Sequence, residues 1–138
     1  MRRRGISKAF RITLVAVVVA SAWIAPGSEG SALSAFHTPG WIVQCYVVGE
    51  EAPAVLICSM PSDGGFVSME AKGRVRTGVD TRNKGRRDPF AARRLLAFGR
   101  YWRFGALFGC VSRSTGLKCW NAGGHGWTLL RDGHKRLF

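Results

Sequence analysis

The chain has 138 residues, and its 21 lysines and arginines outnumber its 8 aspartates and glutamates, giving a formal net charge of +13. This length leaves room for one domain. The sequence contains no GxSxG, GxxxxGK[ST] or GxGxxG pattern, so the usual signatures of serine hydrolases, P-loop proteins and dinucleotide-binding enzymes are excluded. No cofactor is predicted.

The N-terminus predicts an export signal. Basic side chains between residues 2 and 11 precede an apolar run from Ile12 to Ala25, and small residues follow. This layout fits cleavage after Ala22, or as late as residue 27. The alternative is an uncleaved anchor, but a spanning helix needs about 20 apolar residues, and Pro26 ends the run early.

The chain therefore divides into three parts. We expect residues 1–22 to be the signal peptide, residues 23–35 a small, polar linker, and residues 36–138 a single domain. The mature protein is expected to be secreted, either extracellular or held at the cell envelope, and to lack a membrane span.

Cysteines come in two local pairs, Cys45 with Cys58 and Cys110 with Cys119. An even number in an exported chain predicts disulfides. The short spacing favours these two pairings, each of which would stabilise the fold by roughly 3 kcal/mol. Zinc is the rival interpretation, but zinc ligands usually follow CxxC-like spacing. No metal site is therefore predicted.

Strand patterns flank both pairs. Residues 41–48 and 54–60 are rich in β-branched and apolar side chains and predict a hairpin with Cys45 facing Cys58, followed by a short strand over 66–69. Two cysteine-bridged hairpins, one at each end of the domain, resemble a weak internal duplication with little sequence identity.

The second hairpin is predicted from residues 107–112 and 117–121. Its turn is centred between Ser114 and Thr115, with Gly116 as the left-handed residue that closes the loop. A last strand covers residues 127–131.

The middle of the chain lacks apolar periodicity. Residues 77–88 predict a loop. Asp88 and Pro89 are typical of a helix start and Gly99 of a helix stop, so one short helix is expected near residues 89–96, with a strand over 95–98 as the alternative. The fold class is all-β, a small barrel or sandwich of antiparallel hairpins.

The positive charge is concentrated in residues 72–103, where only Asp80 and Asp88 oppose it. The alternatives are a surface for an anionic polymer and a solvated loop without a partner. The predicted anion-binding side chains are Arg74, Arg76, Arg82, Lys84, Arg86, Arg87, Arg93 and Arg94.

Aromatic and basic residues are interleaved from Arg100 to Phe104, which makes Tyr101 and Trp102 candidates for stacking on a ligand. The alternative is a strand whose aromatics fill the core while its arginines extend outward. Nucleic acid would be the expected partner of a cytosolic chain, whereas export favours anionic envelope polymers or lipid headgroups.

His125, between Gly124 and Gly126, is the candidate for catalysis, since an imidazole can act as a base or a ligand. Acid–base chemistry needs a partner, and the sequence indicates none. The structural alternative, which we favour, is a glycine-rich turn tied down by Asn121.

An ordered set of residues runs along the chain and is densest from Leu96 onward: Phe36, Thr38, Pro39, Cys45, Leu96–Gly99, Gly105, Phe108, Cys110, Ser112, Gly116, Cys119, Asn121, Gly124–Trp127 and Arg131. This set resembles the motif of a family of small secreted bacterial proteins known only as a domain of unknown function. The resemblance covers about residues 36–138, and the chain departs from the family at Gly40–Ile42 and in lacking a middle cysteine pair. It implies a compact β domain with local disulfides and no particular activity.

The sequence thus favours a non-enzymatic binding module that contacts anionic envelope polymers through its basic segment. A secreted hydrolase that uses His125 and a purely structural envelope protein are the alternatives. The oligomeric state is left open.

Overall fold

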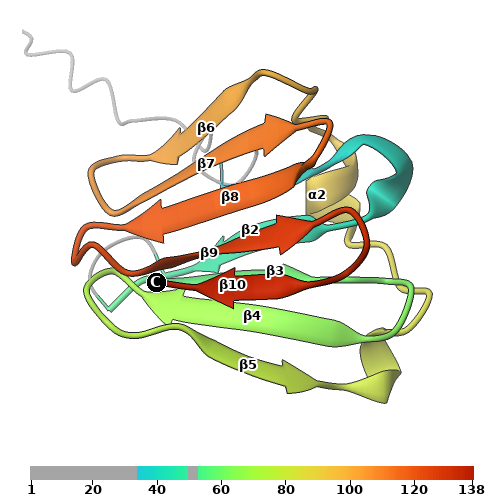
Figure 1. The fold of residues 1–138 in the computed structure, drawn as a ribbon, viewed down its shortest axis with the longest axis horizontal. Coiled ribbons are helices and arrows are strands. Elements are labelled where there is room, and N and C mark those ends of the chain that lie inside the picture. The colour runs from blue at the N-terminus through green and yellow to red at the C-terminus, as the bar shows by residue number, and fades with distance from the viewer. Residues whose placement is uncertain (1–33, 50–52) are drawn as a thin grey trace, which may run out of the picture.

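The computed structural model describes residues 34–49 and 53–138. The predicted signal peptide and most of the predicted linker lie outside these residues. Within them, the strands form two antiparallel sheets in which each strand pairs with its neighbours along the chain (Figure 1).

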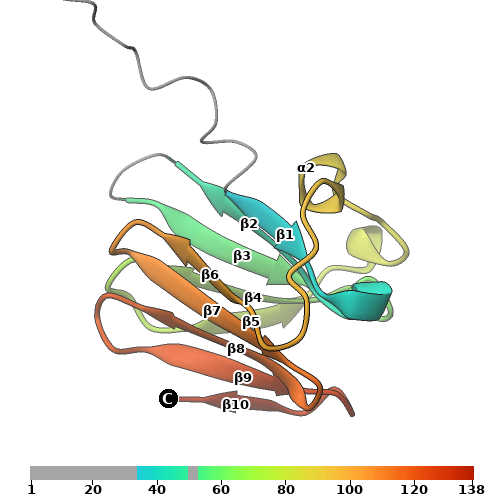
Figure 2. The same ribbon diagram turned by 90° about the horizontal axis from the view of Figure 1, so that it is seen from above.

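Sheet A contains the first five strands in chain order: β1 (Ala35–His37), β2 (Gln44–Val48), β3 (Val55–Ser59), β4 (Gly65–Glu70) and β5 (Arg76–Val79). Sheet B repeats this order with β6 (Tyr101–Phe104), β7 (Phe108–Arg113), β8 (Gly116–Asn121), β9 (Gly126–Leu130) and β10 (Lys135–Leu137). Three short helical turns, η1 (Pro39–Trp41), η2 (Thr81–Asn83) and α2 (Pro89–Ala92), lie in the connections. The sheets lie as two layers (Figure 2), so the predicted all-β fold is a sandwich and not a closed barrel.

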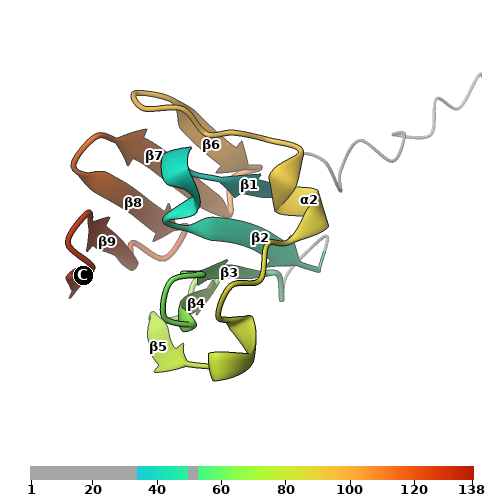
Figure 3. The ribbon, with the colours of Figure 1, turned by 90° about the vertical axis from the view of Figure 1, so that its right-hand side faces the viewer.

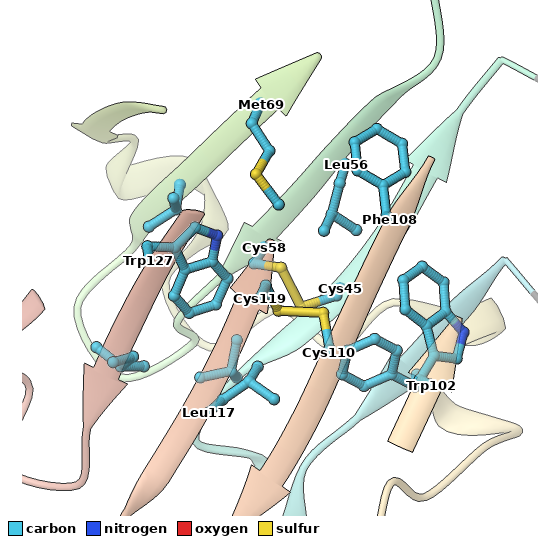
Figure 4. Close-up of a cluster of buried hydrophobic side chains, with 14 of the residues drawn as sticks. Cys45, Leu56, Cys58, Met69, Trp102, Phe108, Cys110, Leu117, Cys119 and Trp127 are labelled. Carbon is cyan, nitrogen blue, oxygen red and sulfur yellow. A yellow bond between two sulfur atoms is a disulfide. The ribbon is translucent and has the colours of Figure 1, made fainter. Parts of the chain in front are cut away.

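Both predicted disulfides are present, Cys45–Cys58 between β2 and β3 and Cys110–Cys119 between β7 and β8. Because side chains alternate between the faces of a strand, all four cysteines point between the sheets. The Sγ atoms of Cys45, Cys58 and Cys119 lie within 4.8 Å of one another. The two bridges therefore meet at the centre of the core (Figure 4).

Large side chains from both sheets surround the bridges. Phe36 lies opposite Cys45, and Trp102 opposite Cys110, in matching positions of the two sheets. Their rings contact each other, with centroids 5.0 Å apart. The repeated strand order and bridge position give the two halves the same topology, as the two bridged hairpins suggested.

Asn121 links the two sheets by hydrogen bonds. Its Oδ1 accepts from the backbone N–H groups of Gly123 and His125, both at 3.0 Å, which ties down the glycine-rich turn as predicted. Its Nδ2 donates to the carbonyl oxygens of Glu70 and Gly73 at 2.8 and 2.7 Å. The side chain is almost fully buried, so these four bonds replace its contacts with water.

The first predicted strand starts later than expected. Residues 39–41 form η1, and β2 begins at Gln44. Gly40 and Trp41 both have positive φ, 70° and 54°, which a strand does not permit. The β-branched and aromatic composition of this stretch concealed the turn that Pro39 and Gly40 form.

Four strands, β1, β5, β6 and β10, were not among the strand and hairpin predictions, and all four are edge strands. Most of β5 falls in the predicted loop 77–88. Edge strands are short and partly exposed, so they show little of the alternation that identifies a buried strand. In β6, Trp102 and Phe104 turn inward, as in the alternative of a core strand, whereas Tyr101 stays exposed.

The predicted helix is a single turn, α2. Its start is as predicted, because Asp88 Oδ1 accepts hydrogen bonds from the backbone N–H groups of Phe90 (2.7 Å) and Ala91 (3.1 Å). The chain then leaves the helix, and Leu95 forms an isolated parallel bridge with His37.

The β7–β8 turn differs in detail from the prediction. Arg113 pairs with Gly116, so Ser114 and Thr115 alone form the loop, and Gly116 is the first residue of β8 with φ of 152°. A Cβ there would collide with the backbone carbonyl of Leu129. The positive φ and the close approach of β9 both require glycine here.

Replacing Cys45 and Cys58 together with alanine should lower the free energy of unfolding by roughly 3 kcal/mol, because the 13-residue separation no longer limits the unfolded chain. The matched Cys110→Ala/Cys119→Ala pair should cost a similar amount. Urea unfolding measures both, and a loss below about 1 kcal/mol for either pair would contradict the expectation.

Asn121→Ala should lower the free energy of unfolding by at least ~2 kcal/mol, since buried N–H and C=O groups lose their partners. The control is Asn83→Ala, because the Asn83 side chain forms no hydrogen bond with the described residues. It should stay within about 0.5 kcal/mol of the parent. Equal urea midpoints for the two variants would show that the Asn121 bonds are not stabilising.

Candidate anion-binding surface

The eight predicted basic residues lie around sheet A but do not form one cluster. Arg74 and Arg76 lie at the β4–β5 end of the sheet, and Arg93 and Arg94 follow α2. The connection between β5 and α2 carries the other four, Arg82, Lys84, Arg86 and Arg87. Figure 3 shows the β5–α2 connection running along the outer side of sheet A. All are exposed except Arg94, which is half-buried.

A groove of about 430 Å³ lies between this connection and the outer face of sheet A. Its floor comes from β2 and β3 and its wall from the loop before α2. It is lined by Gln44, Tyr46, Ser59, Asn83, Arg86, Arg87, Asp88 and Pro89.

Gln44 holds the loop in place. The side chain, 4% exposed, donates from Nε2 to Ser59 Oγ (3.1 Å) and to the backbone carbonyl of Arg86 (2.9 Å). Its Oε1 accepts from the backbone N–H of Asp88 at 2.8 Å. These bonds fix the backbone on both sides of Arg87, so the two arginines are positioned by a buried anchor.

Tyr46 contributes a hydroxyl to the same groove. Burial raises its pKa above the ordinary 10.0, and the negative charge of Asp88 raises it further. The phenol therefore keeps its proton at neutral pH and is able to donate a hydrogen bond. Together with the guanidinium groups of Arg86 and Arg87, it makes the groove rich in donors.

Arg87 lies over the ring of Trp41, with its Cζ 4.8 Å from the ring centroid. His37 stacks on the same residue at 4.1 Å and 11°. The His37 Nδ1 lies 2.7 Å from the Ala91 carbonyl oxygen, which can only accept, so Nδ1 carries the proton. Trp41 holds this position in a strained conformation, at a cost of about 1–3 kcal/mol.

A second groove, of about 230 Å³, lies across the same face. Ser68, Arg74 and Arg76 line it together with one acidic residue, Glu70. The strand register places Tyr46, Ile57, Ser68 and Arg76 in one row across four strands. Since adjacent strands lie about 4.8 Å apart, the row spans roughly 14 Å between the two grooves.

The acids near the β5–α2 loop are already engaged. Asp80 accepts two side-chain hydrogen bonds from Arg82, at 3.0 and 2.9 Å, and these bonds lower the Asp80 pKa. Asp88 caps α2. Among the described residues, Arg86 and Arg87, like the other predicted basic residues except Arg82, form no ion pair within 4.0 Å, so both guanidinium groups are open to a ligand.

The predicted stacking pair does not reach this surface. Trp102 is 1% exposed and packs on Phe36 in the core, so its indole has no face left for a ligand and the stacking prediction is corrected for this residue. Tyr101 is exposed but belongs to β6, the edge strand of sheet B.

Sequence reasoning missed Gln44, Tyr46 and Trp41. A signal was present for the first two, because alternation along the strand places them on the face opposite Cys45. Nothing in the chain order indicated that residues 83–88 would lie over that face. Trp41 was hidden in the strand predicted from its composition.

His125 is half-buried in the turn held by Asn121. In the described part of the chain, no carboxylate pairs with its imidazole. Asp132, the nearest acid in sequence, pairs instead with His134 at 3.0 Å on the surface. Among the described residues, His125 therefore lies in the glycine-rich turn of the structural alternative and has no acid–base partner.

Two further features of the described residues do not offer a polymer or metal site. The clustered cysteine sulfurs are all bonded in disulfides and are not available to a metal. A hollow of about 20 Å³ lies beside Pro39, Ile42, Phe98 and Ser112, whose buried hydroxyl has no partner among the described residues. It has room for about one water molecule and is too small for a polymer.

Comparison with protein-family models, with curated proteins and with solved structures found no match. The family resemblance therefore stays a prediction. In the described residues, none of the helical turns has the length or the apolar composition of a membrane span.

Tyr46 should titrate above pH 10.0, because burial and Asp88 disfavour its anion. The folded state then retains a proton that the unfolded chain releases, so stability falls as pH rises through the unfolded value toward the folded one. Ultraviolet titration of the parent should show a late step that Tyr46→Phe removes. A late step that survives this substitution would contradict the assignment.

Proposed function

We propose that the chain is a secreted, non-enzymatic binding module whose sheet A face contacts anionic polymers of the cell envelope. The observation that carries the proposal is the position of Arg86 and Arg87. The buried Gln44 holds both over a donor-lined groove, and no carboxylate among the described residues pairs with either.

The groove offers the chemistry that phosphate, sulfate or carboxylate groups need. Guanidinium groups form strong, charge-assisted hydrogen bonds with such oxygens, and the neutral Tyr46 hydroxyl adds a further donor. The lining residues include no nucleophile activated by a neighbouring base, which favours binding over catalysis.

The second groove extends the contact. A chain laid across the strands from Tyr46, in the first groove, would reach Arg76, in the second, after roughly 14 Å. This span suits a polymer with repeated charges better than a single small anion. Binding of this kind depends on charge and releases counterions, so it weakens steeply with salt.

Arg86→Ser/Arg87→Ser should elute from a heparin column at markedly lower salt than the parent exported protein, with an unchanged urea midpoint. The slope of log affinity against log salt should fall by about 2, one for each lost contact. Retention on isolated cell envelopes should weaken in the same order.

The matched control is Arg103→Ser/Arg136→Ser, which removes the same charge from exposed positions on sheet B. It should shift elution much less. Equal shifts for the two double variants would show that only net charge matters, and would remove the argument for the sheet A face.

A further inference from the structure

Four large apolar side chains are exposed at one corner of the sandwich, which we call the apolar corner. They are Ile42, Phe90, Leu95 and Phe98, with exposed fractions of 37, 50, 54 and 49%. They come from the residue after η1, from α2 and from the segment after α2, and Figure 2 shows these elements on the same side of the molecule.

Local contacts hold the corner together as one unit. Ile42 and Phe98 line the same small hollow. Leu95 pairs with His37, whose backbone bonds both neighbouring residues: its N–H donates to the Arg94 carbonyl (2.9 Å) and its carbonyl accepts from Leu96 N–H (2.8 Å). The His37 ring in turn donates to Ala91, the residue next to Phe90.

Arginines surround these apolar groups. The Arg93 guanidinium lies 5.6 Å from the Phe90 ring centroid, and Arg87 lies over Trp41, the neighbour of Ile42. Arg94 and Arg100 flank Leu95 and Phe98 in the chain. The one acid in this region, Asp88, is engaged as the α2 cap.

We propose that the apolar corner docks on an anionic lipid surface. Phe90, Leu95 and Phe98 would enter the boundary between headgroups and acyl chains, while the arginines contact lipid phosphates. Basic groups beside protruding aromatic and aliphatic side chains are the combination that binds anionic bilayers at their interface.

The charges argue against the other occupants. A symmetric contact with a second copy would place the same patch against itself, and so would bring arginine against arginine. A protein partner would have to supply an apolar pocket ringed by acidic groups to match this corner. An anionic bilayer supplies acyl chains and negative charge together.

The test is co-sedimentation of the exported protein with phosphatidylglycerol–phosphatidylcholine vesicles and with pure phosphatidylcholine vesicles. The parent should bind the anionic vesicles and bind the neutral ones much more weakly. Phe90→Ser/Phe98→Ser should lower the partition coefficient on anionic vesicles by about tenfold or more. Its retention on heparin should not change, which separates this proposal from the sheet A face.

The matched control is Val79→Ser/Leu137→Ser, which removes from β5 and β10 two apolar side chains that are at least as exposed. This variant should bind vesicles like the parent. Equal vesicle binding by the Phe90/Phe98 variant and the parent would overturn the proposal. So would sedimentation of the parent as a dimer that this variant converts to a monomer, because a second copy would then cover the corner.

Discussion

The contact between the two disulfides is the constraint on which the rest of the structure depends. Each bridge joins directly opposite residues of neighbouring strands and so prevents that hairpin from slipping in register. The bridges also lie against each other, with sulfur atoms within 4.8 Å across the two sheets. A chain of this size buries only a modest core. The two bridges lie within that core.

The strand register that places the cysteines on the inner face of sheet A also decides which side chains lie on its outer face. With Cys45 turned inward beside Cys58, Gln44 must turn outward beside Ser59, and Tyr46 must follow on the same side. Gln44 then binds the backbone on either side of Arg87. The donor-rich groove is thus a consequence of the disulfide register, although no cysteine touches it.

The sequence by itself determined the features that depend on neighbours in the chain. Both disulfides were predictable because each closes a short loop within one hairpin. The Asp88 cap and the Asn121 turn were predictable for the same reason, since their acceptors reach backbone groups two to four residues away. The concentration of charge in residues 72–103 is likewise a property of composition.

Only the tertiary structure decided which side of each element faces the core and which distant segments meet. Trp102 lies among arginines, as a residue of a surface strand would, and it is a core residue because it pairs with Cys110 and faces the same side of sheet B. Gln44 and Arg86 are 42 residues apart, and no local pattern encodes their contact. The fold brings these groups together because the chain between β5 and α2 returns over the outer face of sheet A, where buried polar side chains need partners.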